Sequence, residues 1–121
     1  MRTTTSTAPR VLIVDDHDGM RLALRVLLEA QGVVVVGEAP DGSRGVQMAQ
    51  ALLPDVVILD GRMPVMNGEE AARVLRDVLP AARILAFSAS FESRPWWADA
   101  FVPKERFADV LPTIEEMVVA A

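Results

Sequence analysis

The clearest pattern along this chain is a set of five short apolar runs separated by longer amphipathic stretches. The runs occupy residues 11–14, 33–36, 56–59, 83–87 and 101–102. Short apolar runs rich in β-branched residues are typical of strands that a parallel sheet buries on both faces. The pattern therefore predicts five strands, the last of them short.

The stretches outside these runs repeat with helical spacing. The positions that predict four helices are Met20, Leu22, Ala23, Val26, Leu27 and Ala30; Val46, Ala49, Gln50 and Leu53; Ala71, Val74, Leu75 and Val78; and Phe107, Val110, Leu111, Ile114, Met117 and Val118. Gly32 and Pro54 should end the first two helices, residues 40–43 should form a turn, and Asn67 should cap the third helix. Pro112 should kink the last helix, at a cost of about 3 kcal/mol. Strands alternating with helices predict an α/β fold, a doubly wound parallel sheet with helices on both faces.

Length, charge and composition narrow the possible functions. The 121 residues suffice for one domain, which we place at residues 10–119, after a short disordered tail at residues 1–9. A net charge of -5 argues against direct nucleic acid binding and against attachment to an anionic membrane. No apolar stretch approaches the roughly 20 residues that a membrane span needs. The chain lacks cysteine, which excludes disulfides and cysteine-bound zinc and is compatible with a reducing cytoplasm.

Polar side chains of types that bind metals or take part in catalysis follow four of the five predicted strands. Asp15 and Asp16 follow the first, Asp60 the third and Ser88 the fourth, and Lys104, the only lysine, follows the fifth. Ligands of open parallel sheets bind beyond the carboxyl ends of the strands, so these residues should converge. Neighbouring carboxylates repel each other unless a cation lies among them, and Mg²⁺ suits an all-oxygen site that retains water. The sequence therefore predicts a magnesium and phosphoryl site.

Four segments carry a family resemblance. The runs VLIVDDHDGM, VVILDGRMPVMNG, ILAFSAS and FVPK, in this order, resemble the receiver domain of two-component response regulators, from residue 10 to about 119. The resemblance implies a flavodoxin-like five-stranded sheet of order 2-1-3-4-5. It also implies a cytoplasmic phosphoprotein of a phosphorelay, which catalyses its own phosphorylation and dephosphorylation without being classed as an enzyme.

The resemblance also implies roles for the acidic residues. Asp60 would accept a phosphoryl group from the phosphohistidine of a sensor histidine kinase or a phosphotransfer protein. Asp16 and Asp60 would bind Mg²⁺ directly, together with the backbone carbonyl of Arg62, and Asp15 would act through metal-bound water. The loose, highly charged transition state of phosphoryl transfer is stabilised mainly by positioning and charge neutralisation.

Further roles follow for the ends of the fourth and fifth strands. Lys104 and the hydroxyl of Ser88 would each contact a phosphoryl oxygen. Phe101 would be the aromatic switch residue, turning inward when the Ser88 region closes on the phosphoryl group. Residues 90–102 and the last helix would then contact a second copy of the chain or a downstream protein.

One segment departs from the family pattern. Only 15 residues separate Ser88 from Lys104, too few for a full helix, two loops and a strand. Pro95 disfavours helical geometry at the residue before it, so we expect the fourth helix to be one turn or absent. Trp96 and Trp97 in this segment either cover the exposed core or form a patch for a partner. Pro103 directly precedes Lys104 and could alter the reach of that lysine.

Two alternatives compete with a phosphorylated receiver. The start of the motif, Asp16 to Gly19, also fits haloacid-dehalogenase-like phosphatases, in which Asp16 would be the nucleophile and Asp60 would have no role. That fold also requires an acidic pair at a strand end after the lysine. The second alternative is a pseudo-receiver, an interaction module that never turns over phosphate. His17 fits an exposed loop residue better than a ligand.

Overall fold

The computed structural model describes residues 8–119, so the tail predicted at residues 1–9 lies largely outside the described part. The elements, in order, are β1 (Arg10–Val14), α1 (Asp18–Ala30), β2 (Val34–Ala39), α2 (Gly42–Leu52), β3 (Val56–Leu59), α3 (Gly68–Val78), β4 (Arg83–Ser88), β5 (Ala100–Pro103), the 3₁₀ helix η1 (Lys104–Asp109) and α4 (Val110–Val119). Across residues 8–119, no helix combines the length and hydropathy that a membrane span requires.

All five strands run parallel in the order β2-β1-β3-β4-β5, which confirms the predicted fold class and strand order. The register brings the strand ends together: Leu59 of β3 lies beside Val14 of β1. On the other side, Ser88 of β4 lies beside Pro103 of β5. Asp15, Asp60 and Lys104 therefore leave the sheet at one edge.

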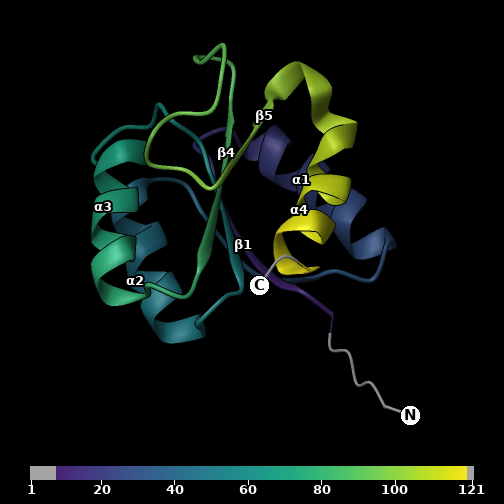
Figure 1. Cartoon of the computed structure of the whole chain (residues 1–121), viewed down its shortest axis with the longest axis horizontal. Helices are drawn as coiled ribbons and strands as arrows, with labels where there is room; N and C mark the ends of the chain where they lie inside the picture. The colour runs from purple at the N-terminus through teal and green to yellow at the C-terminus, as the bar shows by residue number, and fades with distance from the viewer. Residues whose placement is uncertain (1–7, 120–121) are drawn as a thin grey trace.

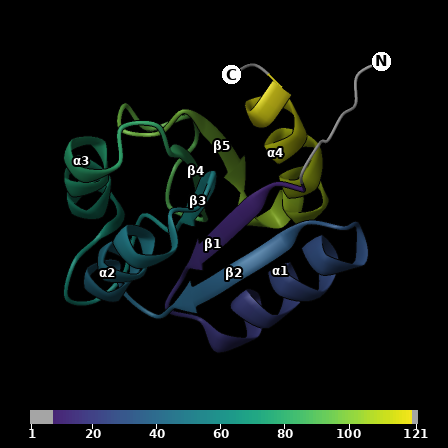
Figure 2. The same ribbon diagram turned by 90° about the horizontal axis from the view of Figure 1, so that it is seen from below.

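Helices cover both faces of the sheet, with α1 and α4 on one side and α2 and α3 on the other (Figures 1 and 2). Successive strand residues point to opposite faces, so neighbouring positions enter different cores. Val11 and Ile13 pack with Leu24 and Leu28 of α1 and with Ile114 of α4. The second core lies over the opposite face and contains Leu12, Val14, Ala49, Leu75 and Trp97. The strands are thus buried on both faces, as their apolar runs predict.

The buried face of α1 differs from the predicted stripe. Leu24 and Leu28 are fully buried, whereas Leu22 and Val26 are 61% and 60% exposed. The helix ends at Ala30, where its pattern predicts, but begins at Asp18, two residues before the first position of the predicted stripe. Apolar residues lie nearly all round this helix, so their periodicity cannot select one face. Only packing against the sheet does so.

Three local predictions need correction. The turn predicted at residues 40–43 is shorter, because Asp41 caps α2 and the helix begins at Gly42. The second strand is displaced toward the C-terminus, to Val34–Ala39, and includes Gly37, against which the Met48 side chain packs. Pro112 occupies the first turn of α4, where its missing N–H breaks no intrahelical hydrogen bond. The non-helical backbone lies earlier, at Arg106.

The segment between β4 and β5 contains no helix across residues 89–99, all of which are described, so the helix expected to be short is absent. The label α4 therefore belongs to the last helix. Trp97, at 4% exposure, packs in the core on the α2 and α3 side. Asp99 anchors the end of the segment by accepting a hydrogen bond from the Ile84 backbone N–H at 2.8 Å. The predicted capping of α3 by Asn67 is confirmed and forms a capping box with Glu70.

Candidate functional site

The carboxyl edge of the sheet holds three buried polar side chains. Asp15, Asp60 and Ser88 follow or end β1, β3 and β4, and are 1%, 4% and 0% exposed. Buried carboxylates are uncommon unless a cation compensates their charge. These are also the only buried polar residues within the described part of the chain. The burial of these polar side chains indicates a functional site at this edge of the sheet rather than a solvated surface.

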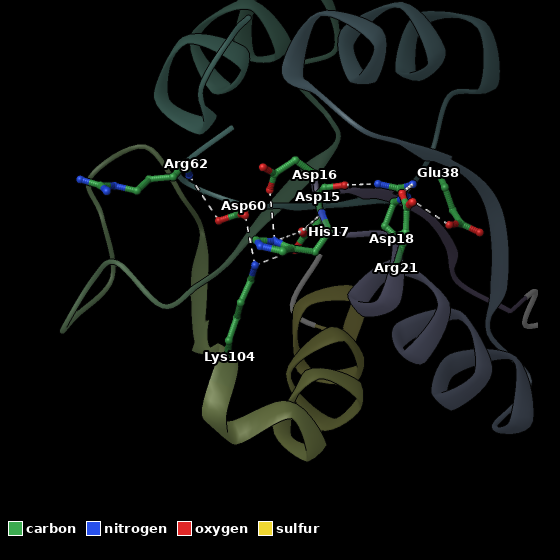
Figure 3. A network of polar contacts seen from close by, with 9 residues as sticks. All are labelled: Asp15, Asp16, His17, Asp18, Arg21, Glu38, Asp60, Arg62 and Lys104. Carbon is green, nitrogen blue, oxygen red and sulfur yellow. Dashed lines mark hydrogen bonds and ion pairs between the residues drawn. The ribbon is translucent and has the colours of Figure 1, made fainter. Parts of the chain in front are cut away.

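Lys104 reaches into this edge despite the preceding proline. Its Nζ lies 3.0 Å from Asp15 Oδ2 and 3.1 Å from Asp60 Oδ2, between the two carboxylates (Figure 3). Pro103 is the last residue of β5, so Lys104 is the first residue beyond the sheet. The contact with Asp60 is a hydrogen bond, whereas Asp15 Oδ2 accepts no well-aligned hydrogen bond from any described group. The ammonium of Lys104 is thus shared between the two buried carboxylates.

The charges of Asp60 and Lys104 are coupled. Burial raises the pKa of Asp60, repulsion from Asp15 raises it further, and the attraction of Lys104 offsets only part of this. Burial alone would lower the pKa of Lys104, but its contacts with Asp15 and Asp60 outweigh burial and raise it. One lysine therefore compensates the two carboxylates incompletely. A divalent cation with oxygen ligands would relieve the remaining repulsion.

A possible set of metal ligands lies beside the ion pair. Asp15, Asp16, Asp60 and His17 each offer one ligand atom, and these atoms all lie within 4.8 Å of one another. The three carboxylates are hard oxygen donors of the type that Mg²⁺ prefers. Because one lysine compensates the buried carboxylates incompletely, this donor set fits a magnesium ion.

His17 is an exposed loop residue, as predicted, but its contacts with the aspartates were not predicted from the sequence. Its side chain is 68% exposed, yet Nδ1 lies 3.2 Å from both Asp15 Oδ1 and Asp16 Oδ1. Its backbone N–H also donates to Asp15 Oδ1 at 2.9 Å. An aspartate that accepts from the backbone two residues later forms an Asx turn, which is the signal that could have predicted this placement.

Arg62 presents its backbone, rather than its side chain, to the site. Its N–H donates to Asp60 Oδ1 at 3.3 Å, while the guanidinium points away from the carboxylates (Figure 3). This orientation is compatible with the predicted use of the Arg62 backbone carbonyl as a metal ligand.

Ser88 and Phe101, the two predicted switch residues, lie on neighbouring strands. The Oγ of Ser88 accepts a hydrogen bond from the Ser90 N–H at 3.1 Å. Phe101 is half-buried and packs edge-on against Phe91, with 6.3 Å between ring centroids.

Phe91 is a second residue that sequence patterns missed. Its ring also packs edge-on against Trp97, at 5.9 Å. A Cβ atom at Gly61 would lie only 2.4 Å from Phe91 Cε2, so the ring occupies the space beside the residue after Asp60. The segment that lacks a helix is thereby packed directly against the residue that follows Asp60 at the end of β3.

The two tryptophans have different surroundings. Trp97 is buried against Phe91, so the interpretation as core cover holds for this residue. Trp96 is 66% exposed, with the Arg73 guanidinium 4.9 Å from its ring centroid.

The phosphatase alternative finds little support. It leaves Asp60 without a role, although Asp60 is buried and contacts Lys104. Glu115 and Glu116 lie exposed on α4, and not at the end of a strand.

Comparison with known proteins gives consistent matches. A family model described as the response regulator receiver domain matches residues 11–100. The nitrate/nitrite response regulator protein NarL of Escherichia coli K12 is 41% identical over 81 residues, which cover 66% of this chain and 38% of that protein. A putative transcriptional regulator of Pseudomonas aeruginosa is 36% identical over 118 residues, which cover 93% of this chain and 54% of that protein.

Solved structures agree with the sequence relatives. The signal receiver domain of the putative response regulator NarL from Mycobacterium tuberculosis has a TM-score of 0.84 and 30% identity, covering 96% of this chain and 100% of that one. By contrast, the chain spans only about half, or less, of the length of the two sequence relatives.

Proposed function

The chain belongs to the response regulator receiver family, and from this premise we propose that Asp60 accepts a phosphoryl group from a sensor histidine kinase or a phosphotransfer protein. The observation that carries the proposal is the placement of Lys104 between Asp15 and Asp60, at 3.0 and 3.1 Å, with both carboxylates buried. A buried nucleophile beside a fixed cation is suited to a reaction in which negative charge builds up on transferred oxygens.

Asp16 and Asp60 would hold Mg²⁺ directly with the backbone carbonyl of Arg62, and Asp15 would hold metal-bound water. The donor set supports this assignment, since the ligand atoms of the three aspartates lie within 4.8 Å of one another. Bound Mg²⁺ would neutralise charge on the phosphoryl oxygens and on the carboxylates. Lys104 would then be free to leave Asp60 and pair with a phosphoryl oxygen.

The bonds made and broken in the transfer step belong to Asp60 and to the phosphohistidine of the donor. A carboxylate oxygen of Asp60 forms a bond to phosphorus as the P–N bond of the phosphohistidine breaks, and the electron pair of that bond stays on the imidazole nitrogen. A cavity of about 530 Å³, lined by residues that include His17, Met20, Ala89 and Lys104, opens beside the site and offers an approach for the donor ring. Hydrolysis of the acyl phosphate by water later returns the free carboxylate and inorganic phosphate.

The same site would switch an output surface. The hydroxyl of Ser88 would move to a phosphoryl oxygen, breaking its contact with the Ser90 N–H, and Phe101 would turn inward. Phe91 and Trp97 pack in series with Phe101, so this motion would reach the 90–100 segment. Residues 90–102 and α4 would then bind a second copy of the chain or a downstream protein. Because Trp97 lies in this path and Trp96 beside it, tryptophan emission should change on phosphorylation.

The test is labelling with a small phosphodonor in the presence and absence of Mg²⁺. We expect one acid-labile phosphoryl group per chain, dependent on Mg²⁺ and abolished by Asp60→Asn, because an amide is a poor nucleophile. Asp77→Asn, an exposed aspartate on α3, is the matched control and should label normally. Persistent full labelling of the Asp60→Asn variant would place the acceptor elsewhere.

The absence of a helix across residues 89–99 favours one second candidate, a pseudo-receiver that binds partners without turning over phosphate. The same experiment separates the two. Wild-type protein that binds Mg²⁺ but never labels, with small phosphodonors or with phosphorylated histidine kinases, would support the pseudo-receiver.

A further inference from the structure

Arg21 joins the acidic loop to two secondary-structure elements. It lies in α1, with its side chain 14% exposed, and its Nη1 donates to the backbone carbonyl of Asp15 at 2.5 Å. The same guanidinium contacts the carboxylate of Asp18, and its Nε lies 3.4 Å from Glu38 Oε1 on β2. Figure 3 shows this network reaching from the acidic loop to β2.

The Arg21 contact completes the anchoring of the Asp15 backbone. The N–H of Asp15 donates to the Ala39 carbonyl at the end of β2, at 3.0 Å. Its carbonyl accepts from Arg21. Both polar backbone groups of Asp15 are therefore held in place, which fixes the direction in which the chain leaves β1. The side chains of Asp15 and Asp16 start from this fixed point.

Glu38 holds the guanidinium of Arg21 in position. Its Oε1 faces Arg21, while its Oε2 accepts a hydrogen bond from Arg25 Nη1 at 2.5 Å. Arg25 is itself held by Glu29, 3.2 Å away on the same helix. The planar fork of arginine allows one side chain to contact a carbonyl and two carboxylates together, which a lysine cannot do.

We propose that Arg21, oriented by Glu38, is a positioning residue that sets the affinity of the acidic loop for Mg²⁺. This inference rests on the proposed function, because it assumes that Asp15 and Asp16 serve a magnesium ion. Groups that orient metal ligands without touching the metal typically change metal affinity by about 10- to 100-fold when they are removed. Without Arg21, the carbonyl of Asp15 loses its donor, and the loop can rotate its carboxylates away from the ion.

A purely structural role is the competing explanation, since Arg21 also links α1 to β2. Arg25 provides a matched control for it. Arg25 pairs with the same Glu38 and links the same two elements, but its side-chain contacts are with Glu29 and Glu38. Removing Arg25 should weaken the α1–β2 contact while leaving the carbonyl of Asp15 bound.

The experiment measures the Mg²⁺ dissociation constant by calorimetric titration and the free energy of unfolding by urea, without any phosphodonor. We expect Arg21→Ala to weaken Mg²⁺ binding about tenfold. Arg25→Ala should bind Mg²⁺ with wild-type affinity, even if its free energy of unfolding falls as much as that of Arg21→Ala. Arg21→Lys should fall between wild type and Arg21→Ala, since lysine can still donate to the carbonyl of Asp15.

Two results would overturn the inference. One is wild-type Mg²⁺ affinity in both Arg21→Ala and Arg21→Lys, and the other is an equal loss in Arg21→Ala and Arg25→Ala. If Arg21→Ala fails to fold, Arg21→Lys carries the test alone, and unchanged affinity in that variant overturns the inference. Wild-type protein that binds no Mg²⁺ would instead overturn the proposed function, so the two failures are distinguishable.

Discussion

Replacing Lys104 by methionine tests how much this lysine contributes to the stability of the folded protein. Methionine keeps the length and much of the apolar stem of the side chain but removes the ammonium. In the wild type this ammonium lies 3.0 Å from Asp15 and 3.1 Å from Asp60. The variant would therefore leave two buried carboxylates facing each other without a cation.

The magnitude follows from distance and burial. A pair of unit charges 3.0 Å apart interacts with about 5 kcal/mol at an effective dielectric constant of about 20. Desolvation of the charges cancels much of this, and removing one partner of a buried ion pair typically costs about 3–5 kcal/mol. The Lys104 side chain is 15% exposed, so water can reach part of it. We therefore expect Lys104→Met to lower the free energy of unfolding by about 3 kcal/mol at pH 7 without Mg²⁺.

The pH dependence has a definite sign. The folded-state pKa of Lys104 is raised, so its contribution is complete below the ordinary value of 10.5 and is lost only above it. The pKa of Asp60 is also raised, and loss of the lysine would raise it further. Protonation of Asp60 at acidic pH therefore relieves the charge repulsion in the variant, and the difference in unfolding free energy between the two proteins should shrink from pH 7 toward pH 4. Under the proposed function, added Mg²⁺ should also stabilise the variant, because a ligand that binds the folded state alone favours that state.

The assay is urea unfolding followed by circular dichroism at several pH values, with and without Mg²⁺. Arg106→Met is the matched control, since Arg106 is an exposed cation, 67% accessible, that pairs with Asp109. Exposed pairs contribute at most about 1 kcal/mol, so the control should change little. Equal stability of Lys104→Met and wild type at pH 7 would refute the reasoning, as would a deficit that is independent of both pH and Mg²⁺.

Three further predictions concern the surroundings of Asp60. Gly61→Ala would place a methyl group 2.4 Å from Phe91 Cε2 and should cost about 1–3 kcal/mol in urea unfolding; adding Phe91→Leu should recover most of the loss. Trp97→Ala should cost about 3–5 kcal/mol because the ring is buried, whereas Trp96→Ala should change the unfolding free energy by less than about 0.5 kcal/mol. Asp60→Asn should stabilise the Mg²⁺-free protein at pH 7, because the raised pKa of Asp60 makes its ionised form unfavourable in the folded state. That gain should disappear as the pH falls toward 3.8, and destabilisation at pH 7 would contradict it.

Much of the fold could be predicted because its signals are local. The third strand runs from Val56 to Leu59, as its apolar run indicates, and Asn67 caps α3 through a side chain three residues from its partner. Chain length alone excluded a full helix between Ser88 and Lys104, since too few residues remain. The prediction for Pro112 was wrong, because this proline lies in the first turn of α4 rather than inside a longer helix that it would kink.

The convergence of Asp15, Asp60, Ser88 and Lys104 was also predictable, because parallel strands end at one edge of a sheet and each residue follows or ends a strand. Their roles in phosphoryl transfer remain proposals. The distances between them come only from the structure. So does the finding that Pro103 leaves Lys104 within reach of both carboxylates.

By itself, the sequence determined the order of strands and helices, the parallel sheet and the edge at which the polar residues gather, because periodicity and turn residues act over a few neighbouring positions. The tertiary structure alone decided which side of α1 is buried, which tryptophan enters the core, and that Phe91 fills the space beside Gly61. It also brought Arg21 to the carbonyl of Asp15. No periodic pattern in the sequence indicates these contacts. They form only when close packing brings the assembled elements together.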